Sequence, residues 1–229
     1  MKDRRTKIGK TYGSKRFHQL AIIVLDGSFS MNDPGNFNMK IKEEVHLAVS
    51  GLYTRMKISK VANCFSSTVI SFDDSPPKIK FPITPLADVD EHQNFDPTIG
   101  HDGGTEIFRA LEEAEKVADD FLNGIDEEGV PHSVMILLLS DGLCFDPERT
   151  KQVAERIKAK NHIQIATCYF SIKGQPDIDA QELMKSVCSN PAQYYATVYG
   201  EETLRNFFIK SLSQSTGSSE LMVVNNDRK

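Results

Sequence analysis

Two uninterrupted apolar runs constrain the fold of this chain more than any other feature. Leu20–Leu25 is a run of six apolar residues, and a second run of six lies within Ser133–Ser140. Strands that are covered on both faces of a parallel sheet have this pattern, whereas half-exposed strands alternate. Each run leads to an aspartate, Asp26 or Asp141. The sequence therefore predicts two central strands with a carboxylate at the tip of each.

Amphipathic segments with helical spacing separate these runs. Flanking prolines and alternating lysines indicate an edge strand at residues 78–81, because both features discourage further pairing. The expected strands are residues 20–25, 68–72, 78–81, 133–140, 163–170 and about 193–199, and the expected helices lie near 39–57, 105–121, 147–157, 179–188 and 201–213. This alternation predicts an α/β fold: a doubly wound, mostly parallel six-stranded sheet with one antiparallel edge strand and helices on both faces.

The charge of the chain is unevenly distributed. Residues 1–17 contain seven Lys or Arg against one Asp, a net charge of +6, which leaves −11 for the remainder of a chain of net charge −5. We expect a basic N-terminal arm at 1–17, one domain at 18–214 and a flexible C-terminal tail at 215–229. The arm is typical of a solvated tail, although it could contact an acidic partner. The acidic body argues against nucleic acid, because phosphates require a basic surface.

The composition also indicates where in the cell the protein is expected. No run approaches the roughly 18 apolar residues of a membrane span, and no apolar region follows the basic start as in a secretory signal. The four cysteines are widely spaced without a C-x-x-C pattern, which argues against a zinc site and a disulfide framework. We therefore expect a cytoplasmic protein with no membrane association; the oligomeric state stays open.

Five oxygen-bearing side chains are predicted to meet at one edge of the sheet. Asp26, Ser28 and Ser30 form a D-x-S-x-S pattern after the first strand, Thr105 follows two glycines, and Asp141 follows the fourth strand. Ligands bind beyond the carboxyl ends of the strands in such sheets, where the strand order reverses. Carboxylate and hydroxyl oxygens suit Mg²⁺, with Mn²⁺ or Ca²⁺ as alternatives, rather than Zn²⁺ or copper.

Other interpretations remain at this point. Each motif alone could be ordinary turn or helix-cap chemistry. A Mg²⁺-dependent phosphotransfer enzyme or hydrolase could also place Asp26 at a strand tip, but a haloacid-dehalogenase-like enzyme needs a second Asp where Ser28 stands. A dinucleotide-binding domain would need G-x-G-x-x-G after the first strand, which is absent. His101 and Asp102 precede Thr105, and we expect them to form an exposed loop pair.

The five positions resemble the metal-ion-dependent adhesion site (MIDAS) of the von Willebrand factor A (VWA) family. That site combines D-x-S-x-S, a loop Thr and an Asp after the fourth strand, and no position of the motif departs from it here. The resemblance covers about residues 18–214 and implies a Rossmann-like VWA fold. It implies that Ser28, Ser30 and Thr105 bind Mg²⁺ through hydroxyls, while Asp26 and Asp141 act directly or through water.

The same resemblance implies a function. VWA domains use a partner's Asp or Glu to complete the metal site, so we expect a metal-dependent protein-interaction module rather than an enzyme. The chain shows no signal peptide or attached module, which is more similar to stand-alone bacterial VWA proteins. Those of tellurium-resistance gene clusters are an example, and a bacterial stress-response role is the corresponding expectation.

Overall fold

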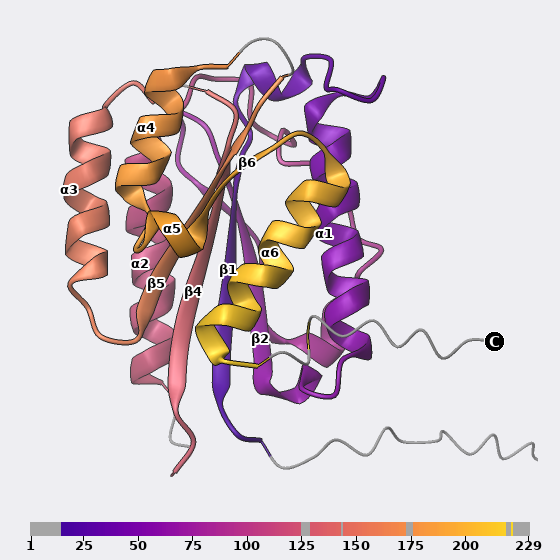
Figure 1. Cartoon of the computed structure of the whole chain (residues 1–229), viewed down its shortest axis with the longest axis vertical. Helices are drawn as coiled ribbons and strands as arrows, with labels where there is room; N and C mark the ends of the chain where they lie inside the picture. The colour runs from indigo at the N-terminus through magenta and orange to yellow at the C-terminus, as the bar shows by residue number, and fades with distance from the viewer. Residues whose placement is uncertain (1–14, 125–128, 143, 173–175, 219–220, 222–229) are drawn as a thin grey trace, which may run out of the picture.

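A six-stranded sheet forms the centre of the molecule (Figure 1). The structure is a computed structural model that describes residues 15–124, 129–142, 144–172, 176–218 and 221. The strand order is β3-β2-β1-β4-β5-β6, and β3 alone pairs antiparallel among these strands. The strands are β1 (His18–Asp26), β2 (Phe65–Phe72), β3 (Lys78–Pro85), β4 (His132–Ser140), β5 (Ile163–Phe170) and β6 (Tyr195–Val198).

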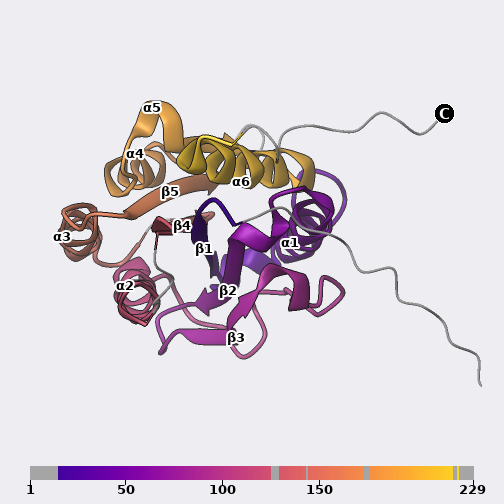
Figure 2. The ribbon, with the colours of Figure 1, turned by 90° about the horizontal axis from the view of Figure 1, so that it is seen from below.

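Helices cover both faces of the sheet (Figure 2), which confirms the predicted doubly wound α/β architecture. One face packs against α1 and α6, and the other against α2, α3 and α4. The helices are α1 (Ile41–Ile58), α2 (Ile107–Asn123), α3 (Pro147–Lys158), α4 (Ile178–Val187), α5 (Pro191–Tyr194) and α6 (Glu201–Thr216), with short 3₁₀ turns η1 (Phe29–Asn32), η2 (Ala62–Cys64) and η3 (Leu86–Asp88). None of the described helices is long and apolar enough to cross a membrane.

The central strands contribute to two cores at once. In β1, Ile23 and Leu25 belong to the core beneath α1 and α6, whereas Ile22 and Val24 belong to the core beneath α2. Successive side chains of a strand point to opposite faces, so only a continuous apolar run fills both cores. This explains why the apolar run of β1 predicts a central strand.

The strand order changes direction between β1 and β4. Starting at β1, the chain first adds β2 and β3 on one side and then crosses to add β4, β5 and β6 on the other. The loops after β1 and β4 therefore lead to opposite sides of the sheet, and such folds bind ligands at this point, beyond the carboxyl ends of the strands. Asp26 and Asp141 stand at this position, as the sequence predicts.

Several boundaries differ from the sequence-based prediction. The second strand begins at Phe65 rather than 68, and a helical turn precedes β6 where a strand near 193 was expected. At the C-terminus, α6 continues to Thr216 and the side chain of Leu221 is buried in the core. At the N-terminus, Phe17 packs edge-on against Phe65, with ring centroids 5.4 Å apart. The predicted arm and tail therefore each include residues of the fold, and the rest of both segments lies largely outside the described residues.

Candidate functional site

Asp26 is the buried anchor of the candidate site. It is the last residue of β1 and is fully buried. Its Oδ1 accepts a hydrogen bond from the Ser28 backbone N–H (2.9 Å), and its Oδ2 accepts one from the Ser140 hydroxyl (2.6 Å). The side chain is therefore fixed from its own turn and from the neighbouring strand β4.

A chain of hydrogen bonds links four of the predicted site residues between the ends of β1 and β4. The hydroxyls of Ser28 and Ser30 are 3.2 Å apart, and Ser30 donates to Asp141 Oδ1 at 2.9 Å. The turn that brings the two serines together is η1, which begins directly after Ser28. Four of the five predicted residues thus meet in one cluster, formed by the loops after β1 and β4.

The loop that carries Thr105 is hydrogen-bonded through its backbone to the turns beside this cluster. Phe29 N–H donates to Gly103 O (2.9 Å), and Phe145 N–H donates to Thr105 O (3.0 Å). The loop therefore lies between the turns after β1 and β4, and Thr105 is buried there. The sequence predicts that the helix begins at Thr105. In the structure α2 begins at Ile107 with Glu106 at its N-cap, so Thr105 lies in the preceding loop.

Burial and charge repulsion dominate the electrostatics of the two carboxylates. Burial raises the pKa of Asp26, against the hydrogen bonds from Ser140 and Ser28. Burial and repulsion by Asp26 raise the pKa of Asp141 to about 7. Among the described residues, no Lys or Arg side chain pairs with either carboxylate. The described part of the site therefore holds two carboxylates without a basic side chain to compensate them.

The donor set fits a hard divalent cation. Two carboxylates and three hydroxyls are the oxygen ligands that Mg²⁺ and Ca²⁺ prefer. Across the described parts of the chain, no three His, Cys, Asp or Glu side chains are grouped as metal ligands, so a site of the zinc type is not seen there. A cation here would depend on the hydroxyls of Ser28, Ser30 and Thr105 as much as on the carboxylates.

Sequence reasoning missed the side chains that support the site. Ser140 lies opposite Asp26 because Leu25 pairs with Leu139, and this strand register is the signal that could have identified it. The expectation of an exposed His101 is wrong: this side chain is buried and lies 2.8 Å from Asp73. Asp102 is exposed, as expected. The residues that follow Asp73 are typical of a turn, so nothing in the sequence indicates that Asp73 contacts His101.

The fold and site together define a class: a doubly wound α/β domain with an acidic, hydroxyl-rich cluster at its switch point. The sequence model of the von Willebrand factor type A domain matches residues 22–210. The chain therefore belongs to this family, and the family resemblance inferred from the sequence is confirmed. No curated protein matched the chain in a sequence comparison.

Solved structures with the same fold are distant in sequence. The pilus adhesin SpaC from Lactobacillus rhamnosus GG is 12% identical, with a TM-score of 0.70 over 91% of this chain and 31% of its own. Proximal thread matrix protein 1 from the mussel byssus, in a structure with a zinc-occupied MIDAS motif, is 15% identical, with a TM-score of 0.57 over 87% and 46%. The VWA domain of SpRpn10 is 13% identical, with a TM-score of 0.59 over 85% and 95%. The chain thus spans about a third of the adhesin, and these likenesses show the fold alone.

Proposed function

We propose that this chain is a protein-interaction module that binds an acidic side chain of a partner through a divalent cation. The cation would be held by Asp26, Ser28, Ser30, Thr105 and Asp141, which fill every position of the family's metal motif. The observation that carries the proposal is that buried Asp26 and partly buried Asp141 are joined through Ser28 and Ser30 at the switch point of the sheet, with no Lys or Arg partner among the described residues.

The donor set favours Mg²⁺ as the resident ion, with Mn²⁺ or Ca²⁺ as substitutes. When bound, such an ion supplies positive charge and a coordination position for an outside oxygen ligand. Three of the five proposed ligands are neutral hydroxyls, so the ion would keep more of its positive charge than in a site made of carboxylates alone. A partner's Asp or Glu is therefore the best match in charge and in ligand type.

Two exposed aromatic residues beside the site support a protein as the partner. Phe29 and Phe145 are 67% and 68% exposed, and each is fixed through its backbone to the loop that carries Thr105. The Phe145 ring also covers Gly104, where an added Cβ would lie 2.2 Å from the ring. Aromatic side chains held in place on a surface are typical of interaction sites.

A metal titration with matched variants tests this function. We expect Mg²⁺ or Mn²⁺ to raise the melting temperature of the wild type, and Asp26→Ala or Thr105→Ala to abolish that rise. Ser67→Ala is the matched control, because Ser67 is a buried hydroxyl of β2 that donates to Ala21 O (2.9 Å) away from the site. The control should keep the metal response; identical responses of the wild type and the site variants would contradict the proposal.

Partner capture tests the second half of the proposal. A partner retained in Mg²⁺ should be released by chelator and should not bind the Thr105→Ala variant. Replacement of one Asp or Glu in that partner by Asn or Gln should abolish capture. If capture survives both chelator and Thr105→Ala, the metal does not mediate the interaction.

We further propose that the chain is not an enzyme, that it acts in the cytoplasm, and that it belongs with stand-alone bacterial VWA proteins such as those of tellurium-resistance systems. Ser28 occupies the position where a haloacid-dehalogenase-like enzyme needs its second Asp, and a hydroxyl cannot replace that carboxyl as an acid or base at neutral pH. Turnover of phosphate esters that depends on Asp26 would overturn the first point, and cell fractionation tests the second.

A further inference from the structure

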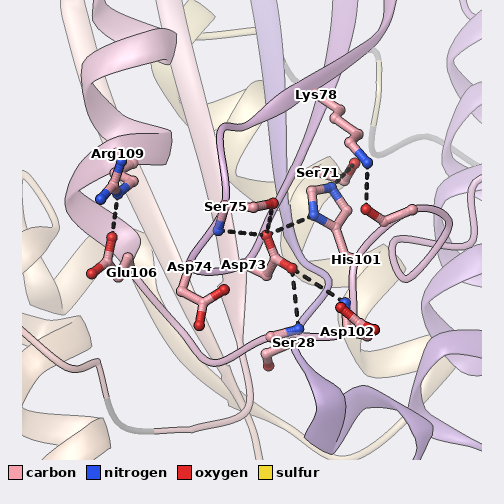
Figure 3. Close-up of polar contacts among 12 residues, drawn as sticks. Ser28, Ser71, Asp73, Asp74, Ser75, Lys78, His101, Asp102, Glu106 and Arg109 are labelled. Carbon is pink, nitrogen blue, oxygen red and sulfur yellow. Dashed lines mark hydrogen bonds and ion pairs between the residues drawn. The ribbon is translucent and has the colours of Figure 1, made fainter.

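We propose that Asp73 and His101 act as positioning residues that fix the loop supplying Thr105, and that the affinity of the metal site depends on them. The inference rests on the proposed metal site and adds two residues to it that do not belong to the family's metal motif. It follows from a buried network at the tip of β2 (Figure 3).

Asp73 uses both of its carboxylate oxygens. It directly follows β2 and is buried. Its Oδ1 accepts from the Ser75 backbone N–H (2.9 Å) and hydroxyl and lies 2.8 Å from His101 Nδ1. Its Oδ2 accepts from the backbone N–H groups of Asp102 (3.2 Å) and Gly103 (3.1 Å). One oxygen thus holds the turn after β2 and the other holds the Thr105 loop.

His101 continues the connection into the sheet. Its Nε2 lies 3.1 Å from the Ser71 hydroxyl, and its side chain is fully buried. The order Ser71–His101–Asp73 matches that of a hydrolase triad. Ser71 is only 1% exposed, however, so a substrate cannot reach its hydroxyl. The geometry therefore assigns this group to holding the loop and not to catalysis.

The held loop leads directly to the metal site. Gly103 accepts from Phe29 N–H, next to Ser28, and Gly104 N–H donates to Asp74 Oδ2 (3.1 Å). The loop also packs closely on the turn after β1: a Cβ at Gly27 would lie 2.4 Å from Pro97 O and 3.2 Å from His101 Cβ. A loop fixed this tightly on both sides places Thr105 without adjustment when a ligand arrives, which favours binding.

The experiment combines Asp73→Asn with two measurements. The amide keeps the size of the carboxylate but offers a single acceptor oxygen, so one side of the network loses its acceptor. In metal-free protein, hydrogen exchange should show loss of protection at the Asp102 and Gly103 amides. By calorimetric titration, the dissociation constant for Mn²⁺ should rise about 10- to 100-fold, the usual effect of losing a supporting contact to a metal ligand.

Asp177→Asn is the matched control for this variant. Asp177 also accepts a backbone N–H, from Ala180 at 2.9 Å, and also lies at the carboxyl edge of the sheet. The substitution removes the same charge without touching the Thr105 loop, so Mn²⁺ affinity should change less than about twofold. An equal loss of affinity in this control would assign the effect to charge and overturn the positioning role.

The His101 variants separate positioning from a loss of stability. His101→Asn retains a donor that can reach Asp73, whereas His101→Ala does not. We expect Mn²⁺ affinity to follow the order wild type, His101→Asn, His101→Ala. Wild-type affinity in Asp73→Asn and His101→Ala would overturn this inference and leave the proposed function intact. Failure of the wild type to bind Mn²⁺ would instead remove the proposed function. If Asp73→Asn does not fold, the two His101 variants decide.

Discussion

The carboxylates at the tip of β2 and at the tips of the β1–β4 pair lie in opposite environments. At the tip of β2, burial would raise the pKa of Asp73, but hydrogen bonds from Ser75, His101 and Gly103 outweigh it and lower the pKa below its ordinary value. At the tips of β1 and β4, burial raises the pKa of Asp26, and burial together with repulsion by Asp26 raises the pKa of Asp141. The protein itself satisfies the carboxylate of Asp73, whereas Asp26 and Asp141 have no Lys or Arg partner in the part of the chain that the structure describes.

This difference separates a structural role from a binding role. A carboxylate that accepts several N–H groups is stable as an anion and serves to hold the chain. Repulsion between buried Asp26 and partly buried Asp141 would destabilise the metal-free protein and so favour the cation that we propose for this site. The two regions meet in the loop at 101–105, which is held by Asp73 and carries Thr105.

The largest difference between variants of the two regions is expected in their affinity for Mn²⁺. Asp26→Asn keeps the size of a proposed ligand but removes its charge, and it should weaken Mn²⁺ binding at least about 100-fold, more than loss of a supporting contact does. Asp73→Asn should weaken it less, because Asp73 is not one of the five proposed ligands. Calorimetric titration of both variants tests this order, and equal losses would show that the two regions do not differ as described.

In chelator, Asp73→Asn should be destabilised by about 1–3 kcal/mol at neutral pH, because N–H groups lose a charged acceptor. The folded pKa of Asp73 is lower than the unfolded value, so its contribution is fully present above the unfolded pKa and is lost as pH falls. The stability gap between the wild type and the variant should therefore narrow below about pH 4. Urea unfolding across pH measures it, and a gap that widens with acid would contradict the assignment.

Compared with Asp73→Asn, Asp141→Asn should change the unfolding free energy in the opposite direction. Its folded pKa of about 7 lies above the unfolded value, so ionisation costs stability as pH rises. In chelator at pH 8, removal of this charge should stabilise the protein by about 1–2 kcal/mol, and the gain should shrink toward pH 5. Addition of Mg²⁺ should reverse the order, because only the wild type then gains from the cation. If Asp141→Asn is less stable than the wild type at pH 8 in the presence of chelator, repulsion between Asp26 and Asp141 does not destabilise the protein.

The smallest effect on stability is expected at the rim of the site. Phe29→Ala and Phe145→Ala remove exposed side chains and should change the unfolding free energy by less than about 0.5 kcal/mol. Metal affinity should also remain near that of the wild type, while affinity for a captured partner should fall. Ile58→Ala, an exposed apolar residue at the opposite end of α1, is the control and should leave partner binding unchanged.

The fold could be predicted because the sequence carries its periodicities openly. The apolar runs of β1 and β4 are typical of strands covered on both faces, and the apolar residues of α2 recur at clear helical spacing. Short segments were harder. Tyr194 and Tyr195 are compatible with helix or strand, and the structure ends α5 at the first and begins β6 at the second. Leu221 is buried through a long-range contact that no local pattern reveals.

The cluster at the β1 and β4 tips was predictable in part for the same reason. Residues at the ends of neighbouring parallel strands meet regardless of loop detail, so Asp26 and Asp141 could be paired in advance. The contacts of His101 could not be predicted, because an exposed loop and a loop that folds onto β2 can have the same composition. Asp73 and Ser71 become partners of His101 only through that folding. Long-range hydrogen bonds made by loops could therefore not be predicted from the sequence.

The central claim is that Asp26, Ser28, Ser30, Thr105 and Asp141 hold a divalent cation. Crystals of the protein grown with excess Mn²⁺, with diffraction collected near the manganese absorption edge, test it most directly. We predict an anomalous density peak bounded by these five side chains, at roughly 2.0–2.3 Å from the directly bound oxygens. A map without a peak at that position, or with the five side chains turned away from one another, would contradict the claim.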